Sequence, residues 1–275
     1  MKLFKNRQSA ALMALPYILW AVVFIVVPLC MVIFYGITDD NGSFTMSNIA
    51  TIAESGYFKA LVKSVLLAVI STIICFLLAY PLGMILSSMK LKRNTYIVTL
   101  FILPMWMNFL LRTLTWMTLL EGKGVINTVL SFFGLPGINI INTSSAIVLG
   151  MVYNFLPFMI LPIYNSLSKI DDNVINAARD LGAGTVQTFL KITLPLSAPG
   201  ILSGITMVFI PALTTFAIST MLGGSKILLI GNIIEQQFTQ AYNWHLGSGL
   251  SIVLMIFIFI NMIIESMADK KGGQG

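Results

Sequence analysis

The sequence predicts an all-α, polytopic membrane protein with six transmembrane helices, and three observations support this fold class. First, 57% of the 275 residues are hydrophobic and only 9% are charged, with a mean hydropathy of +0.92, whereas soluble domains carry roughly 25% charged residues. Second, several apolar runs reach the ~20 residues that a helix needs to cross a bilayer. Third, these runs are continuous rather than alternating, which excludes a transmembrane β-barrel.

The apolar runs place the six spans within a single membrane domain that covers residues 1–275. The first run follows Lys2, Lys5 and Arg7, as in a signal peptide, but it is too long and no small-residue cleavage site follows. We therefore expect an uncleaved first span. The predicted spans are about 11–37, 60–88, 95–120, 143–168, 198–222 and 246–268.

The distribution of basic residues predicts the orientation of the chain. With the N-terminus inside, eleven of the sixteen Lys and Arg residues fall on the inner side, four fall outside, and Arg112 lies within a span. Cytoplasmic loops of membrane proteins carry such an excess of basic residues. We therefore expect both termini in the cytoplasm, and the net charge of +6 reflects topology rather than nucleic-acid binding.

The loop between the fourth and fifth spans, residues 169–197, is semi-polar and looks folded. Asp171, Asp172 or Asn173 can cap a first helix, and Gly182 and Gly184 suit its end. A second helical piece follows at about 185–193, and Pro195 is expected to end it. The result is a helix–turn–helix elbow on the cytoplasmic surface. It either fits a groove in another protein or packs as a connector on its own membrane domain.

The elbow resembles the cytoplasmic loop signature of ABC-importer permeases, EAA-x3-G-x9-I-x-L-P. The spacing matches throughout, but Asn176 replaces the usual Glu, and Asp180 stands one turn later as a substitute. The resemblance implies that the loop docks into a cytoplasmic ATPase, which uses ATP and Mg, while this chain binds no cofactor and is not an enzyme. The implied coupling residues are Asn176, Ala177, Ala178, Asp180, Leu181, Gly182, Ile192, Leu194 and Pro195. Of these, Ala177, Ala178 and Leu181 are expected to share one face.

Three further stretches, 103–127, 156–167 and 221–238, are similar to the first permease subunit of spermidine/putrescine ABC importers. The resemblance implies import through a bacterial cell membrane. It implies a complex with a second permease, two ATPase subunits and an extracellular polyamine-binding protein, in contact with lipid and without nucleic acid. A permease for another solute, such as an amino acid, sugar, iron or a phosphonate, is the main alternative, because the coupling motif does not separate these substrates.

A polyamine path needs acids or aromatic faces, because the substrate is a flexible polycation. No acid falls in the middle of a predicted span, so we expect the second permease or acids at the outer mouth to supply the negative charge. The candidates are the aromatic residues Trp106, Trp116, Tyr153 and Phe216, the neutral residues Asn108 and Thr220, and the acids Asp39, Asp40, Glu121 and Glu235.

Arg112 is the one charge deep within a predicted span, and it would repel a polyamine. Charged residues inside membranes are expensive and normally paired. We therefore expect Arg112 to pair with an acid or with helix-end carbonyls of the second permease, which would fix the third span. The alternative is that it lies nearer the interface and extends outward to water.

Two other function classes fit the residues less well. A secondary transporter would want acids in the middle of its spans, and the predicted spans hold none there. An enzyme would need a nucleophile with a base, or paired carboxylates. The only histidine, His245, stands beside Trp244 at the outer end of the sixth span, where an interfacial role is expected.

Two loops on the outer side also show structural patterns. The stretch 124–140 has the pattern of a short amphipathic helix, and we expect 223–238 to form an interfacial or re-entrant element.

Overall fold

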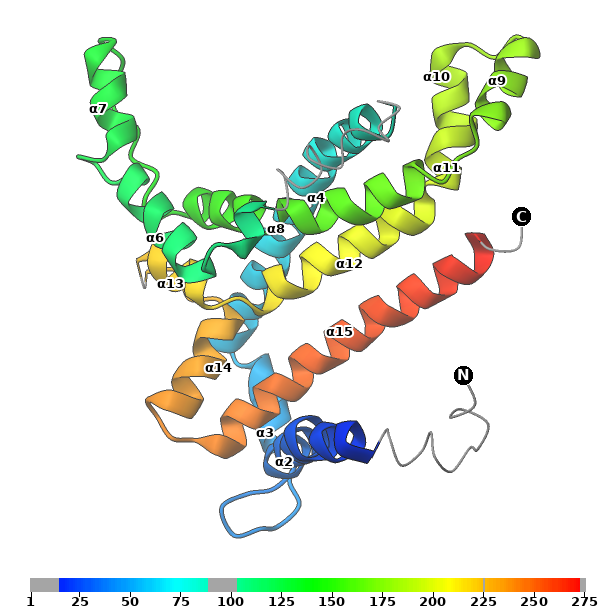
Figure 1. The fold of residues 1–275 in the computed structure, drawn as a ribbon. Helices are drawn as coiled ribbons and strands as arrows, with labels where there is room; N and C mark the ends of the chain where they lie inside the picture. Colours follow the sequence, from blue (N-terminus) through cyan, green and yellow to red (C-terminus); the bar gives the residue numbers. More distant parts are fainter. Residues whose placement is uncertain (1–14, 89–102, 225, 273–275) are drawn as a thin grey trace. The chain divides into compact units, whose positions relative to one another are not determined.

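The computed structural model describes residues 15–88, 103–224 and 226–272, and this part of the chain is helical (Figure 1). It divides into two compact units. The first combines Met1–Tyr57 with Ile234–Ile256, and the second combines Phe58–Ile233 with Phe257–Gly275. Each unit is described by itself.

Within the described residues, four helices are long and apolar enough to cross a membrane. They correspond to the first, second, fourth and sixth predicted spans, and a bent pair, Thr185–Leu196 with Ala198–Thr214, is compatible with a fifth. The predicted third span lies partly outside the described residues, and its described part is η3 (Leu103–Trp106) followed by α6 (Phe109–Leu120). The four helices are Leu15–Gly36, Ser55–Ser88, Ser144–Leu167 and Trp244–Met267.

In the first unit, the apolar helix that begins at Leu15 continues through η1 (Val22–Val26) into α2 (Val27–Gly36). Almost all of its side chains are exposed, so lipid or another chain must cover them in the membrane. Only its end is packed, where Gly36 lies against Gly249 and Ile252 of α15 (Trp244–Gly272). The short helices α3 (Ser47–Ala50) and η2 (Thr51–Ala53) complete this unit.

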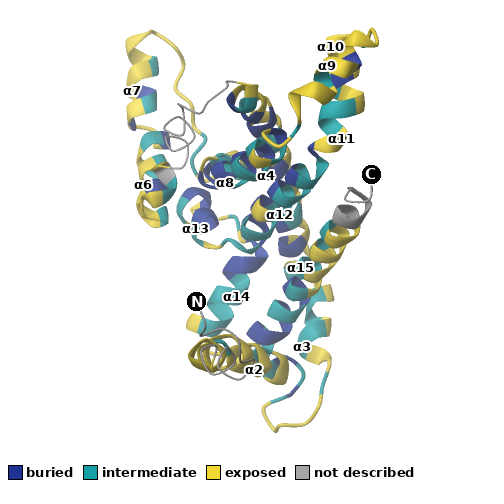
Figure 2. Ribbon diagram, turned by 45° about the vertical axis from the view of Figure 1, so that its right-hand side comes forward, coloured by how far each residue is buried: buried dark blue, intermediate teal, exposed yellow. Residues whose placement is uncertain are grey.

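The core of the second unit is the pairing of α8 (Ser144–Leu167) with α12 (Ala198–Thr214), joined by α4 (Ser55–Ser88). Gly200 and Gly204 allow α12 to approach the Pro162 carbonyl and Met159 of α8, because a side chain at either glycine would collide with them. Figure 2 shows the buried residues gathered on the facing sides of these helices.

The fifth span is broken, which corrects the prediction of a continuous helix over 198–222. The helix α12 ends at Thr214, Thr215 is extended (ψ 136°), and α13 covers Ala217–Gly223. Pro211 lies just before the break and removes one backbone hydrogen bond. The break needs polar partners at membrane depth, because lipid offers none.

Asn232, on α14 (Ile230–Thr239), supplies those partners and is itself buried. Its amide nitrogen donates to the Phe216 carbonyl at 3.1 Å and to the Thr220 hydroxyl at 2.8 Å. Its carbonyl oxygen accepts from the Ser219 hydroxyl at 2.6 Å and from the Leu229 amide at 3.1 Å. All four hydrogen-bonding positions of this amide side chain are therefore used to hold the break.

Short helices form in both stretches that were predicted to lie outside the membrane, and their place relative to the membrane stays a prediction. The helix α7 (Val125–Phe132) forms within 124–140 and is followed by Gly134 at φ 69°. The second stretch, 223–238, contains α14, which is too short to span and follows a left-handed Gly224. In the second unit, α6, α7 and α13 lie at one end of the α8–α12 pair, and the elbow formed by α9, α10, η4 and α11 lies at the other (Figure 1).

Candidate functional site

The first helix of the elbow, α9 (Asp172–Asp180), begins and ends as predicted. The Asp171 side chain caps it by accepting from the Asn173 amide at 2.9 Å. At the other end Gly182 has φ 85°, its amide donates to the Arg179 carbonyl at 2.9 Å, and the Ala183 amide donates to the Ala178 carbonyl at 3.0 Å. This paired bonding is the Schellman motif, which requires a left-handed residue and therefore favours glycine.

The second helical piece does not end before Pro195, which corrects the prediction. It runs from α10 (Thr185–Thr188) through the π-helical turn η4 (Phe189–Thr193) into α11 (Leu194–Leu196). Because of the π-helical turn, Pro195 lies in the first turn of α11. At this position the N–H that proline lacks would have no intrahelical carbonyl to bond. The bend comes after Leu196, where the axis turns by 63° into α12.

The signature residues of the elbow are not all on one exposed face. Ala178 is buried, with 8% of its surface exposed, whereas Ala177 and Asp180 are exposed and Leu181 is 89% exposed. The expectation that Ala177, Ala178 and Leu181 form one open face is therefore wrong for Ala178, which packs within the elbow. The exposed apolar tip is instead Leu181 with Val186, as the exposed colour of this region in Figure 2 shows.

The remaining signature positions follow the helix–turn–helix path. Ile192 and Leu194 are half-buried, and Pro195 is exposed. Apart from its chain neighbours, no described residue has an atom within 4 Å of where a Cβ on Gly182 would stand. The glycine is thus required by its positive φ and not by close packing within the chain, and its surroundings leave room for an approaching surface.

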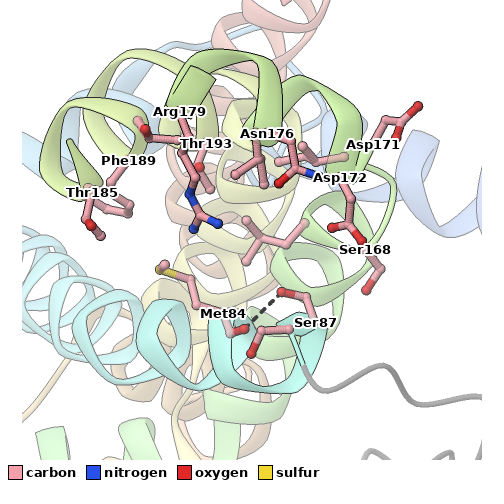
Figure 3. Close-up of a pocket in the computed structure, with 15 residues that line it drawn as sticks. Met84, Ser87, Ser168, Asp171, Asp172, Asn176, Arg179, Thr185, Phe189 and Thr193 are labelled. Atoms are coloured by element: carbon pink, nitrogen blue, oxygen red, sulfur yellow. Dashed lines mark hydrogen bonds between the residues drawn. The ribbon is translucent and has the colours of Figure 1, made fainter. Parts of the chain in front are cut away.

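A cavity of about 520 Å³ lies under the elbow, between α9, η4 and the ends of α4 and α8. Asn176 and Arg179 line it, together with Ser87 and Asp172. Figure 3 shows Arg179 extending from α9 into this space toward Met84. Asn176, which stands where the signature has Glu, therefore borders a polar space inside the elbow.

Two buried residues that the sequence patterns do not single out attach the elbow to the membrane helices. The Tyr80 hydroxyl on α4 lies 2.9 Å from the Ser197 hydroxyl at the bend. The Tyr80 ring also packs edge-on against Phe189, with the ring centroids 5.7 Å apart. A tyrosine within an apolar run, and a serine after Leu-Pro-Leu, are the sequence signals for this contact. These contacts join the elbow to α4 next to the start of α12.

Arg112 is buried in α6, with 7% of its surface exposed, so the alternative that it extends outward to water is wrong in this structure. Its Nε and Nη1 atoms have no hydrogen-bond partner among the described residues. The neighbouring Thr113 accepts a bond of 3.4 Å from Asn154, whose own carbonyl oxygen is buried and unpaired there. Pairing of Arg112 with the second permease stays a prediction, and its two nitrogens are suited to such a partner because both can donate.

Four of the six aromatic and neutral path candidates form two groups in the second unit. Trp116 and Tyr153 pack edge-to-face, with centroids 5.2 Å apart, and line an apolar groove of about 670 Å³. Phe216 and Thr220 are exposed one turn apart at the break in the fifth span. The Thr220 hydroxyl donates to the Phe216 carbonyl at 2.9 Å and accepts from Asn232, so it is already partnered.

Three further path candidates lie at the ends of α6, where one caps the helix and two are exposed. Asn108 caps α6 by accepting from the Leu110 amide at 2.9 Å, so its oxygen is occupied. Trp106 is 80% exposed, and Glu121 is exposed at the C-terminal cap of α6. The structure therefore leaves Trp106 and Glu121 available for a ligand, but it does not bring them together.

The acid candidates of the first unit differ in what they contact. Asp39 accepts from the backbone amides of Asn41 and Ser43 within its own turn. Glu235 accepts from the Thr239 hydroxyl at 2.9 Å. Asp40 is 97% exposed and lies 3.5 Å from His245. Of these three acids, only Asp40 is both exposed and part of the lining of a pocket.

Comparison with known proteins places the chain among transport permeases. Residues 79–270 match the family described as "Binding-protein-dependent transport system inner membrane component". The spermidine/putrescine transport system permease protein PotB of Haemophilus influenzae is 35% identical, with 98% of this chain and 97% of that protein covered. PotB of Escherichia coli is 37% identical, with 91% and 94% covered.

Solved structures give the same fold at low identity. A bacterial ABC transporter involved in the import of the acidic polysaccharide alginate matches with a TM-score of 0.77 and 17% identity, over 96% of this chain and 95% of that one. The alginate transporter in complex with a ligand-bound periplasmic protein gives a TM-score of 0.78 and 15% identity, over 95% and 94%. At this identity the match shows the fold alone.

Proposed function

We propose that this chain, which belongs to the family of binding-protein-dependent transport system inner membrane components, is a permease subunit of an ATP-driven polyamine importer. The observation that carries the substrate assignment is the near full-length similarity to PotB proteins, at 35–38% identity. The long apolar helices make the chain a multi-pass membrane protein. Import is directed into a bacterial cell, with both termini in the cytoplasm.

The elbow couples the membrane helices to an ATPase in this proposal. Its exposed apolar tip, Leu181 with Val186, enters a groove of the ATPase subunit. Gly182 forms the left-handed turn between them and carries no side chain that would obstruct this contact. Closure of the ATPase pair, which binds ATP and Mg, pulls on α9 through α11. The contact between Tyr80 and Ser197 passes this movement to α4 and α12. This chain itself transfers no phosphoryl group.

The path for the substrate is built between this chain and a second permease. Arg112 pairs with an acceptor on that partner, because its buried guanidinium nitrogens need one. Exposed aromatic faces such as Tyr153 and Phe216 offer weak cation–π contacts, worth roughly 0.5–2 kcal/mol each. Weak contacts suit transport, because the external binding protein selects the polyamine and the permease must release it.

A permease for another solute is the second candidate, and one observation favours keeping it. The structural neighbours import an acidic polysaccharide through the same fold. The fold therefore does not determine the charge of the solute, and the assignment rests on sequence similarity.

The direct test is uptake of labelled spermidine by cells that lack this gene but keep the partner subunits. Complementation with the wild-type chain should restore uptake, and excess unlabelled putrescine should compete whereas an amino acid or a sugar should not. Membrane levels of the chain are checked by immunoblot. Restored uptake of another solute, with no spermidine uptake, would contradict the polyamine assignment while leaving the importer fold in place.

A further inference from the structure

A small pocket in the first unit combines an acid, an imidazole and aromatic rings. It has a volume of about 450 Å³ and is lined by residues from the end of α2, the following loop and the start of α15. The lining residues are Met31, Tyr35, Asp40, Ala241, Tyr242, Asn243, Trp244 and His245. These segments lie at the outer end of the first and last spans in the proposed orientation.

The hydrogen bonds of His245 determine what its free nitrogen can do. Its Nδ1 lies 3.0 Å from the Tyr35 carbonyl oxygen, which can only accept, so Nδ1 carries a proton. Its Nε2 faces the Asp40 carboxylate at 3.5 Å. When the ring is neutral, Nε2 is therefore a bare acceptor that points at a second acceptor. A group with two or more N–H or O–H donors can serve both acceptors, and the carboxylate charge favours a cation there.

The aromatic rings favour an organic cation in that place. Tyr35 packs against Trp244, with centroids 6.4 Å apart, and edge-on against His245 at 5.3 Å. Phe238 packs edge-to-face against Trp244, with the ring centroids 5.5 Å apart. Trp244 and Tyr242 stay largely exposed, so their faces remain open to a ligand. Aromatic faces beside a carboxylate are a recognised arrangement for binding ammonium groups.

We propose that this pocket binds a primary ammonium group of the substrate, which lies beside the Asp40 carboxylate and Nε2 of His245, donates to both and is flanked by Tyr35 and Trp244. The inference rests on the proposed function for the identity of the ligand. An ammonium has three N–H donors and can serve both acceptors at once. The pocket would hold a polyamine at the outer surface after the binding protein releases it.

Asp40 is the one acid among the residues that line this pocket. The nearby Asp39 carboxylate accepts from the amides of its own turn, so its oxygens are already partnered. The negative charge offered to a ligand here is therefore that of Asp40.

The test measures equilibrium binding of labelled putrescine to the purified complete transporter without its external binding protein. Asp40→Asn should weaken binding about tenfold, because a charge-assisted hydrogen bond is lost. His245→Leu should weaken binding by less, because it removes an acceptor but no negative charge. Glu54→Gln, which makes the same charge change at an exposed position of this unit, should behave as the wild type.

Equal putrescine binding by the wild type and Asp40→Asn overturns the site. Docking of the external binding protein is measured in a separate pull-down, and impaired docking with unchanged putrescine binding in Asp40→Asn also overturns the site, because the pocket would then be a protein contact. Spermidine uptake by the same preparations is measured separately. Loss of binding in Asp40→Asn together with no polyamine uptake by the wild type would support the ammonium site and contradict the proposed function, so the two failures are distinguishable.

Discussion

Two interruptions of apolar sequence, the elbow at 169–197 and the break in the fifth span at Thr215, are made in different ways. The first helix of the elbow is specified locally, because its capping aspartate accepts from an amide two residues on and a left-handed glycine closes its other end. The break is held by Asn232, whose side chain reaches back 16 residues to the Phe216 carbonyl. Local signals can be read from sequence, whereas a distant partner can be found only in the structure.

The largest effect should come from removing the distant partner. Asn232→Leu leaves the buried Leu229 amide without its partner and removes three hydrogen bonds that join the start of α13 to α14, although the Phe216 carbonyl still accepts from the Ser219 and Thr220 hydroxyls. Leaving a buried polar group unpaired costs ~1–3 kcal/mol, and each lost hydrogen bond adds to this, so we expect a clear loss of stability. Thermal unfolding of the detergent-solubilised protein checks this, with Gln236→Leu on the same helix as the control. Similar midpoints for both variants would contradict the role of Asn232.

A smaller effect is expected from the left-handed turn of the elbow. Gly182→Ala forces a Cβ into φ 85° and should cost about 1–2 kcal/mol locally, while transport falls several-fold. Gly184→Ala is the matched control, because Gly184 has φ −69° and no atom near its would-be Cβ. Gly182→Asn should retain more activity than Gly182→Ala, since Asn tolerates the left-handed region. Uptake assays at matched membrane levels decide this, and equal activity of both alanine variants would show that the turn is not needed for transport.

Next comes the contact that links the elbow to α4. Tyr80→Phe removes the hydroxyl that lies 2.9 Å from Ser197 but keeps the ring against Phe189. The lost hydrogen bond is worth about 1 kcal/mol. We expect ATP hydrolysis by the complete transporter to continue while less solute is imported per ATP. The two rates are measured together in proteoliposomes, and an unchanged ratio would show that Tyr80 does not transmit the movement.

The smallest effect should come from the helix cap. Asp171→Ala removes the acceptor for the Asn173 amide and should destabilise α9 by about 1 kcal/mol. Asp172→Ala, in the first turn but without a capping bond, should have less effect. Hydrogen exchange of residues 173–180 in the complete chain reports the difference. Equal exchange in the two variants would mean that the cap does not hold the elbow.

The sequence predicted those parts of the fold that depend on nearby residues. The four long helices, the two ends of α9 and the short outer helix α7 are confirmed, because hydrophobicity, caps and glycines act within a few residues. The inward packing of Ala178, the continuation past Pro195 and the broken fifth span were missed. Each depends on contacts beyond the local pattern, as with Tyr80 and Ser197 or with Asn232.

The central claim is that the tip of the elbow enters an ATPase subunit, and site-specific photocrosslinking tests it most directly. A benzoylphenylalanine at Leu181, which is 89% exposed, is compared with one at Phe132, which is 86% exposed on α7. Coupling through the elbow predicts a crosslink to the ATPase from position 181 and none from position 132. Absence of the ATPase crosslink at 181 in an assembled, active transporter, or equal crosslinking from both positions, would contradict it.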